Sequence, residues 1–390
     1  MDTTTTRRAR AVLTKGILHL GEPLPVDLYG RDGQVRFRKG MVFHSEQSLN
    51  RLYEMGLSYE VCDLAAARRR DSTADTGLAG APSGPTLGAR EHPFRAISHQ
   101  AAAVKAAFDA IEEGRHVGEP RLREIAAEIR RIHDRHEDAA LAAVHRVYDR
   151  PYSSLQPVYS VILCEMAGRG LGLDESRREI LALAALTANL GMYGYYDALV
   201  NQKGRLTAAQ RQRLREHPQV SVERLQGQGV TDRLWLEIVR QHHERGDGSG
   251  YPRGLRRGRI LRETAIVSVS DIYLAFIMPR AWRGVVRSHE ALNKIYRMSA
   301  AEDEVIFAGF IKQIGVHPPG TLVRLASGEV AVVTRRNPEN SHYPAVDAVL
   351  GADGRPLPEP VPRDTRVGDY RVVAAYEAAV PVEIDPVRHW

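Results

Sequence analysis

Apolar residues recur three or four positions apart through most of the chain between about residues 99 and 315. The spacing is clear in AAAVKAAFDAIEEG, RLREIAAEIRRIHDRHEDAALAAVHRVYD, VYSVILCEMAGRGLGL, SRREILALAALTANLG, TDRLWLEIVRQHHE and ETAIVSVSDIYLAFIM. It places apolar side chains on one face of a helix and therefore predicts a bundle of amphipathic helices. Thr207 and Thr231 stand where helix N-caps are expected.

Both ends of the chain show alternation of apolar and polar residues, which is typical of strands. DLYGRDGQVRFRKGMVF predicts a hairpin about Asp32-Gly33, and SEQSLNRLYEMG predicts a short helix from a Ser45 cap to a stop at Gly56. TLVRLASGEVAVVTRR predicts a second hairpin about Ser327-Gly328. HYPAVDAVLGADGRPL and DYRVVAAYEA predict further strands.

A segment rich in Gly, Pro, Ser, Thr and Ala separates the first unit from the helices and predicts a flexible linker. The pattern therefore predicts a mostly α protein whose helical bundle is flanked by small β-containing ends. The predicted boundaries are 1–65 for an α/β regulatory module, 66–95 for the linker, 96–315 for the helical domain and 316–390 for a β extension.

Composition supports a globular protein in a reducing compartment. The 390 residues are 43% hydrophobic and 26% charged, which is ordinary for a soluble chain with two or three domains. No apolar run is long enough to span a bilayer, and MDTTTTRRARAV lacks the apolar core of a secretion signal. The two cysteines, Cys62 and Cys164, lack metal-type spacing. We therefore predict a cytoplasmic location without membrane attachment.

The formal net charge of +6 suits an anionic ligand, nucleic acid or an acidic partner. The arginines are scattered and no nucleic-acid-binding motif occurs, so nucleic acid is not the expected partner.

The most specific motif is HHERGDGSGYP, from His242 to Pro252. A lone histidine is usually an ordinary core or surface residue, whereas a pair before such a turn suggests a metal site built from several helices. At this motif the sequence resembles the HD-GYP family of bacterial signalling phosphodiesterases, which hydrolyse cyclic di-GMP at a metal centre in a helical HD domain. The resemblance covers about 96–315 and extends into both ends, where the first segment is similar to regulatory modules.

Carried over by position, the resemblance implies that several catalytic residues are lost. The family's first metal-binding His falls on Gln156, in the helix that ends at Leu171-Gly172-Leu173. The His and Asp of its name fall on Ala188 and Asn189, and a Lys expected to meet substrate phosphate falls on Met192.

Other family positions are retained. They are the metal-binding His217, His242, His243 and Asp271, and the basic residues Arg280 and Arg283 as phosphate contacts. In the family the glycine-rich turn, here Gly248, Gly250, Tyr251 and Pro252, serves the substrate pocket and contacts with GGDEF-domain proteins. Gly248 and Gly250 suit the backbone angles of a tight turn, and Pro252 stiffens its exit.

The losses argue against hydrolysis. Ala188 offers no ligand, and Gln156 and Asn189 offer neutral amide oxygens, which are weak ligands for Fe, Mn or Zn. Two dications without a bridging carboxylate at position 189 would repel each other. His217, His242 and His243 would suffice for one divalent metal with an open position, the alternative being a hydrogen-bonded polar cluster. His133-Asp134, the only His-Asp dipeptide, lies on another helix and is expected on a solvated face.

Three functions stay open at this point. The first is a catalytically inactive HD-GYP protein that binds a partner, such as a GGDEF-domain protein, or the nucleotide. The second is a weak phosphodiesterase with a single metal. The third is a regulator without nucleotide contact that uses its N-terminal module. An apolar helix face would permit a homodimer, which the sequence does not decide.

Overall fold

The computed structural model describes residues 10–13, 18, 24–30, 34–37, 41, 46–60, 91–281, 286–299, 303–376, 382 and 384–390. The chain divides into two compact units. One comprises Met1–Glu91, Val147–Asp149 and Ala378–Arg388, and the other comprises His92–Arg146, Arg150–Glu377 and His389–Trp390. The domain boundaries expected from the sequence at 65, 95 and 315 stay predictions.

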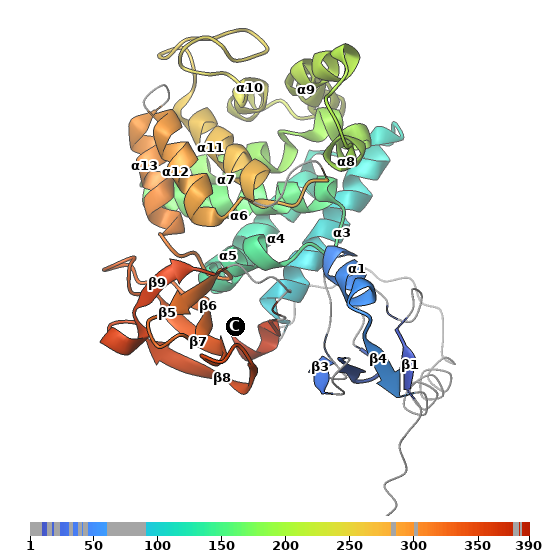
Figure 1. The fold of residues 1–390 in the computed structure, drawn as a ribbon. Helices are drawn as coiled ribbons and strands as arrows, with labels where there is room; N and C mark the ends of the chain where they lie inside the picture. Colours follow the sequence, from blue (N-terminus) through green and yellow to red (C-terminus); the bar gives the residue numbers. More distant parts are fainter. Residues whose placement is uncertain are drawn as a thin grey trace, which may run out of the picture. The chain divides into compact units, whose positions relative to one another are not determined.

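Among its described residues, the first unit contains a small antiparallel sheet and the helix α1 (Figure 1). Its elements are β1 (Arg10–Val12), β2 (Leu28–Tyr29), β3 (Val35–Phe37), α1 (Glu46–Glu54) and β4 (Ser58–Glu60), with the sheet order β1-β4-β2-β3. β2 and β3 pair as the predicted hairpin, although Asp32-Gly33 and Ser45 lie outside the described residues. Gly56, with a φ of 62°, follows α1 as expected.

The second unit is dominated by helices, as the apolar periodicity predicts. They are α3 (Pro93–Glu112), α4 (Glu119–Arg135), α5 (Glu137–Arg146), α6 (Tyr152–Gly170), α7 (Glu175–Thr187), the 3-10 turn η1 (Leu190–Met192), α8 (Tyr193–Asn201), α9 (Ala208–Gly227), α10 (Arg233–Gln241), α11 (Arg262–Ile277), α12 (Ser288–Ser299) and α13 (Glu304–Ile314).

Helix α6 is the centre of this unit. Its side chains are buried from Tyr152 to Gly168, and it packs against α3, α4, α7 and α11. A helix with no solvated face cannot show a strong amphipathic pattern. The apolar spacing of α6 therefore does not predict that this helix lies at the centre of the unit.

Local sequence sets the helix starts. Thr207 forms the predicted cap of α9, where its hydroxyl accepts from Gln210 N–H and the Gln210 side chain accepts from Thr207 N–H in return. The prediction that Thr231 caps α10 is wrong. Asp232 takes this place, and its carboxylate accepts the Trp235 N–H at 2.9 Å. Thr and Asp both suit an N-cap, and the apolar spacing alone does not determine at which of the two residues α10 begins.

The chain ends in a five-stranded antiparallel sheet that belongs to the same unit as the helices. Its strands are β5 (Leu322–Leu325), β6 (Val330–Arg335), β7 (Ala345–Leu350), β8 (Pro356–Asp364) and β9 (Val372–Ala375), in the order β8-β7-β6-β5-β9. The hairpin predicted about Ser327-Gly328 joins β5 to β6. The predicted fold class, a mostly α protein with β-containing ends, is therefore confirmed.

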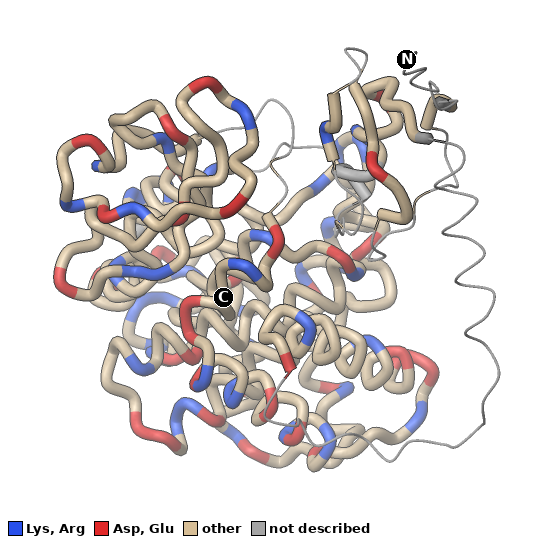
Figure 2. The backbone as a smooth tube through the Cα atoms, turned by 90° about the horizontal axis from the view of Figure 1, so that it is seen from below, with Lys and Arg blue, Asp and Glu red and all other residues tan. Residues whose placement is uncertain are grey.

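Charges of both signs are interspersed along the backbone of the described residues (Figure 2). Among those residues, no helix combines the length and the apolar character needed to cross a bilayer.

His145 on α5 gives the fold a dependence on pH. Its Nε2 lies 2.8 Å from the Tyr273 hydroxyl on α11, and burial lowers the pKa of His145 to about 4. The unfolded chain takes up this proton near pH 6.5, so the contribution to stability is complete above that pH and is lost as pH falls toward 4. We expect His145→Gln to flatten the stability profile between these values by on the order of 1–3 kcal/mol, measured by urea denaturation. An unchanged slope would contradict the assignment.

Candidate metal centre and its surroundings

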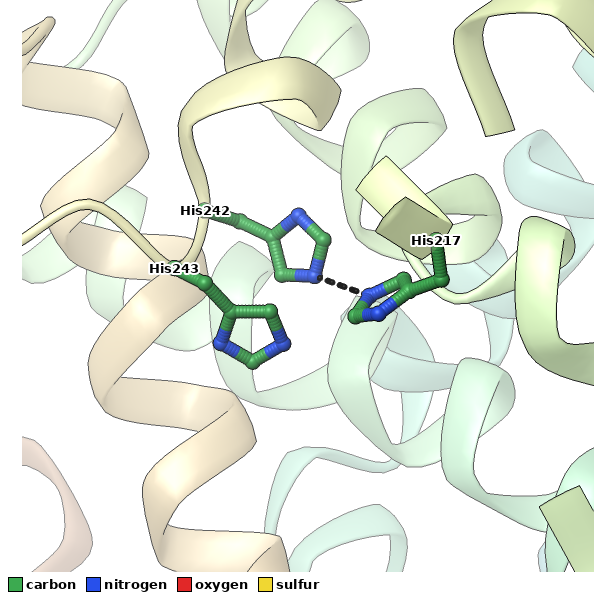
Figure 3. A group of neighbouring side chains, drawn as sticks. All are labelled: His217, His242 and His243. Carbon is green, nitrogen blue, oxygen red and sulfur yellow. Dashed lines mark hydrogen bonds between the residues drawn. The ribbon is translucent and has the colours of Figure 1, made fainter. Parts of the chain in front are cut away.

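Three histidines converge at the end of α10. His217 lies within α9, and His242 and His243 follow the last turn of α10. One nitrogen from each ring lies within 4.8 Å of the other two, and Figure 3 shows the rings facing one another. Within the described part of the chain, this is the group of side chains that could hold a metal ion. The structure thus brings together three of the four retained positions named from the sequence.

The residue after His217 explains how its ring is held. Pro218 has no N–H, which in a regular helix would bond to the carbonyl of Leu214 four residues earlier. That carbonyl lies 2.7 Å from His217 Nδ1 and accepts a hydrogen bond from it. The His-Pro pair therefore leaves Nε2 as the ring nitrogen that presents a lone pair.

His242 is oriented in a similar way by the end of its helix. The Val239 carbonyl, among the last carbonyls of α10, accepts from His242 Nδ1 at 2.6 Å. The Nε2 atoms of His242 and His217 then face each other at 3.1 Å, the contact dashed in Figure 3. Two lone pairs at this distance repel unless a proton or a cation lies between them.

A shared proton is disfavoured at neutral pH. Burial lowers the pKa of His217 and of His243 well below the ordinary value, and burial also lowers the pKa of His242. A divalent ion bound tetrahedrally to two imidazoles at about 2.0–2.1 Å would separate the nitrogens by about 3.3–3.4 Å, close to the observed spacing. His243 supplies a third nitrogen within 4.8 Å of the other two, so the three histidines are a group that could hold one divalent metal.

Asp271 lies in a different group from the histidines. Its Oδ1 accepts a hydrogen bond from Gln156 Nε2 at 3.0 Å and another from Asn189 Nδ2 at 3.1 Å. Gln156 comes from α6, Asn189 follows α7 and Asp271 lies on α11. Gln156 Oε1 and Asn189 Oδ1 are buried without a hydrogen-bond partner among the described residues. The two amide side chains are therefore orientated by the carboxylate, with their nitrogens toward it.

The turn that carries Ala188 and Asn189 is fastened to the helix of His217. The Ser221 hydroxyl on α9 donates to the Ala188 carbonyl at 2.8 Å and accepts from Gly191 N–H at 2.7 Å. A Cβ at position 191 would lie 2.3 Å from the His217 carbonyl oxygen, so only glycine permits this approach. Ala188 and Met192 are both buried here, and neither side chain can bind a metal through oxygen or nitrogen.

The glycine-rich turn is intact and covers the histidines. Gly248 has a φ of +84°, and a Cβ at Gly250 would lie 2.3 Å from the Arg245 nitrogen, so both positions require glycine. The Tyr251 ring packs on His243, with centroids 4.8 Å apart and an interplanar angle of 32°. Pro252, the last residue of the motif, is exposed.

Sequence reasoning missed Glu244, which holds this turn in place. Its buried carboxylate accepts the backbone N–H groups of Arg253 at 2.6 Å and Leu255 at 2.7 Å. The sequence feature that could have identified Glu244 is its position directly between the histidine pair and the glycine-rich stretch.

The two predicted phosphate contacts have different outcomes. Arg280 donates to the Tyr152 hydroxyl at 2.9 Å, and its Nε is buried without a partner among the described residues. No carboxylate of those residues lies within ion-pair distance of it. Arg283 lies outside the described residues.

The expectation of a solvated face for His133-Asp134 is wrong for His133. His133 is 1% exposed because it shares the inner face of α4 with Ile129 and Ile132, whereas Asp134 is exposed. His133 is not part of the histidine group that could hold a metal.

Comparison with known proteins agrees with this arrangement. Residues 129–304 match the model of the HD domain family. The chain is 27% identical over 357 residues to the cyclic di-GMP phosphodiesterase PA4108 of Pseudomonas aeruginosa, covering 88% of this chain and 86% of that protein. It is 33% identical over 127 residues to the cyclic di-GMP phosphodiesterase response regulator RpfG of Xanthomonas campestris, a match that covers 32% of this chain and 34% of RpfG.

A solved structure, the HDG"Y"P protein Bd1817 of Bdellovibrio bacteriovorus, superposes with a TM-score of 0.48 at 16% identity, covering 77% of this chain and 98% of Bd1817. The HD-domain match and the extended similarity to a cyclic di-GMP phosphodiesterase coincide with the intact His-His and Gly-Tyr-Pro motif. Residues 129–304 therefore form an HD domain, and the findings together support a member of the HD-GYP family.

Proposed function

We propose that this protein is a degenerate HD-GYP member that takes part in cyclic di-GMP signalling by binding, without efficient hydrolysis. The observation that carries the proposal is the pair of amide donors on Asp271. Two N–H groups engage both lone pairs of Oδ1, so this oxygen has none left for a metal and only Oδ2 could bind one. At this position the amides of Gln156 and Asn189 supply the positive partners that a cation would otherwise provide.

The neighbouring residues support the same proposal. Ala188 stands where the family has a histidine, and Asn189 carries no charge with which to join two cations. Two dications held close together without an anionic bridge repel strongly. The site therefore lacks the donors for a paired metal centre.

One metal at the histidines is compatible with this proposal. His217, His242 and His243 would hold one iron, manganese or zinc ion, with a position left open for water or a ligand atom. Because a single bound metal can activate water, a weak mononuclear phosphodiesterase is the second candidate function. The convergent histidines favour it, and the absence of charge at position 189 disfavours it.

Binding would use the groups around this centre. Arg280 offers a cation without a carboxylate partner among the described residues and would meet a phosphate. The Gly-Tyr-Pro turn would present a surface to a signalling partner such as a GGDEF-domain protein. A cytoplasmic location and self-association as a homodimer belong to the same proposal, and a regulator without nucleotide contact is the third candidate.

Metal analysis and nucleotide turnover test the proposal together. We expect about one equivalent of metal per chain, heat of binding with cyclic di-GMP in calorimetry, and no linear product in chromatography. His217→Ala should release the metal because it removes one of three nitrogen ligands, whereas His116→Ala, at an exposed position, should retain it. Two equivalents of metal with steady cleavage of cyclic di-GMP would overturn the proposal. Binding heat absent from metal-free and metal-loaded protein alike would favour the third candidate.

A further inference from the structure

The loop between α10 and α11 is rich in arginine. Residues 245–261, with the first residue of α11, are named here the arginine loop. The loop projects from the helices in Figure 1, where it is yellow. It carries one carboxylate, Asp247, against the six exposed arginines Arg245, Arg253, Arg256, Arg257, Arg259 and Arg262. In this loop, positive side chains outnumber the single negative one by six to one.

Most of these charges are available to a partner. Arg253 is paired with Glu237. No carboxylate of the described residues lies within ion-pair distance of Arg245, Arg256, Arg259 or Arg262. Guanidinium groups form paired hydrogen bonds with carboxylates, so a row of them suits acidic side chains on another molecule.

Hydrogen bonds within its own backbone brace the loop. Gly248 N–H donates to the Arg245 carbonyl at 2.8 Å, and Arg257 N–H donates to the Gly246 carbonyl at 3.0 Å. The carboxylate of Glu244 anchors the same loop through the two N–H groups described above. A surface ordered before binding loses less conformational entropy when a partner docks.

We infer that the arginine loop is a docking surface for an acidic segment of a partner protein. Asp247 is exposed among the arginines and accepts Ser249 N–H at 2.8 Å, so its charge stays in place. It would repel a continuous row of phosphates, whereas separate carboxylates on a protein can pair with the arginines on either side. The inference rests on the proposed binding function and names the chemistry of the partner.

Fluorescence anisotropy with a labelled ten-residue glutamate peptide tests the inference on the full chain. The triple variant Arg245→Gln, Arg256→Gln, Arg259→Gln should weaken peptide binding by about tenfold or more at low salt, because it removes three guanidinium groups that would pair with glutamates of the peptide. The matched control removes three exposed arginines elsewhere, through Arg95→Gln, Arg297→Gln and Arg371→Gln. It has the same net charge and should bind nearly as well as the unmodified chain.

Two results would overturn the inference. One is an equal loss of binding in the two triple variants, which would show attraction to net charge alone. The other is tighter binding of an oligothymidylate of equal charge than of the peptide, which would point to nucleic acid. Metal content and nucleotide cleavage, measured on the same samples, report separately on the proposed function.

Discussion

Restoring the lost ligands together, through Gln156→His, Ala188→His and Asn189→Asp, is expected to raise metal content from about one to about two equivalents per chain. The variant should also produce linear nucleotide from cyclic di-GMP, which the unmodified chain should not. The reason lies at Asp271, whose Oδ1 now accepts N–H groups at 3.0 and 3.1 Å. Imidazole and carboxylate in place of the two amides would present lone pairs and negative charge there instead.

The single change Asn189→Asp separates this explanation from a general effect of mutation. Without metal, a carboxylate at 189 would face the Asp271 carboxylate at the distance where an amide now donates. Like charges so close destabilise the fold. The melting temperature of the single variant should therefore be lower than that of the unmodified chain when a chelator is present, and should recover on addition of manganese. Atomic emission spectrometry and thermal denaturation measure the two effects.

A matched control places the same residue types at exposed positions, through Gln226→His, Ala208→His and Asn293→Asp. It should leave metal content and melting temperature unchanged. A folded restoration variant that gains no metal would show that the ligand positions alone do not explain the loss. Gain of metal without turnover would place the remaining defect in the substrate contacts, where Met192 stands for a basic residue.

The fold was predictable where one face of an element is solvated. The helical periodicity of α10 and the alternation of β5 identified these elements, because in each a buried face and a more exposed face differ in composition. Periodicity could not show that α6 lies at the centre, since its side chains are buried on all faces. It also could not separate Thr231 from Asp232 as a cap.

The candidate site was predictable in its residues and less so in its interactions. The motif identified His242, His243 and the turn, and the family resemblance identified His217. The hydrogen bonds of Gln156 and Asn189 to Asp271 join positions 115 and 82 residues apart along the chain. Such pairing depends on how α6, α7 and α11 pack, which a single sequence does not specify. Its effect is to surround Asp271 Oδ1 with two amide donors.

The largest effect on stability is expected from Glu165→Gln on α6. The Glu165 side chain is fully buried and accepts from Arg130 Nε at 2.7 Å, from Arg169 Nε at 2.9 Å and from Arg178. Burial disfavours its charge, but the arginines outweigh burial and lower the pKa of Glu165. The amide would leave the largely buried guanidinium groups of Arg130 and Arg178 without their central counter-charge.

Breaking a buried pair from one side typically costs about 3–5 kcal/mol, and we expect a loss of that size in the free energy of unfolding. Glu175→Gln is the matched control because Glu175 contacts the same Arg130 and Arg178 but its side chain is 69% exposed. Glu175→Gln should lower the free energy of unfolding by less than about 1 kcal/mol, since solvent screens an exposed ion pair. Urea denaturation in chelator, followed by circular dichroism, measures both without a contribution from metal binding. Equal losses in the two variants would mean that the buried charge of Glu165 does not hold α4, α6 and α7 together.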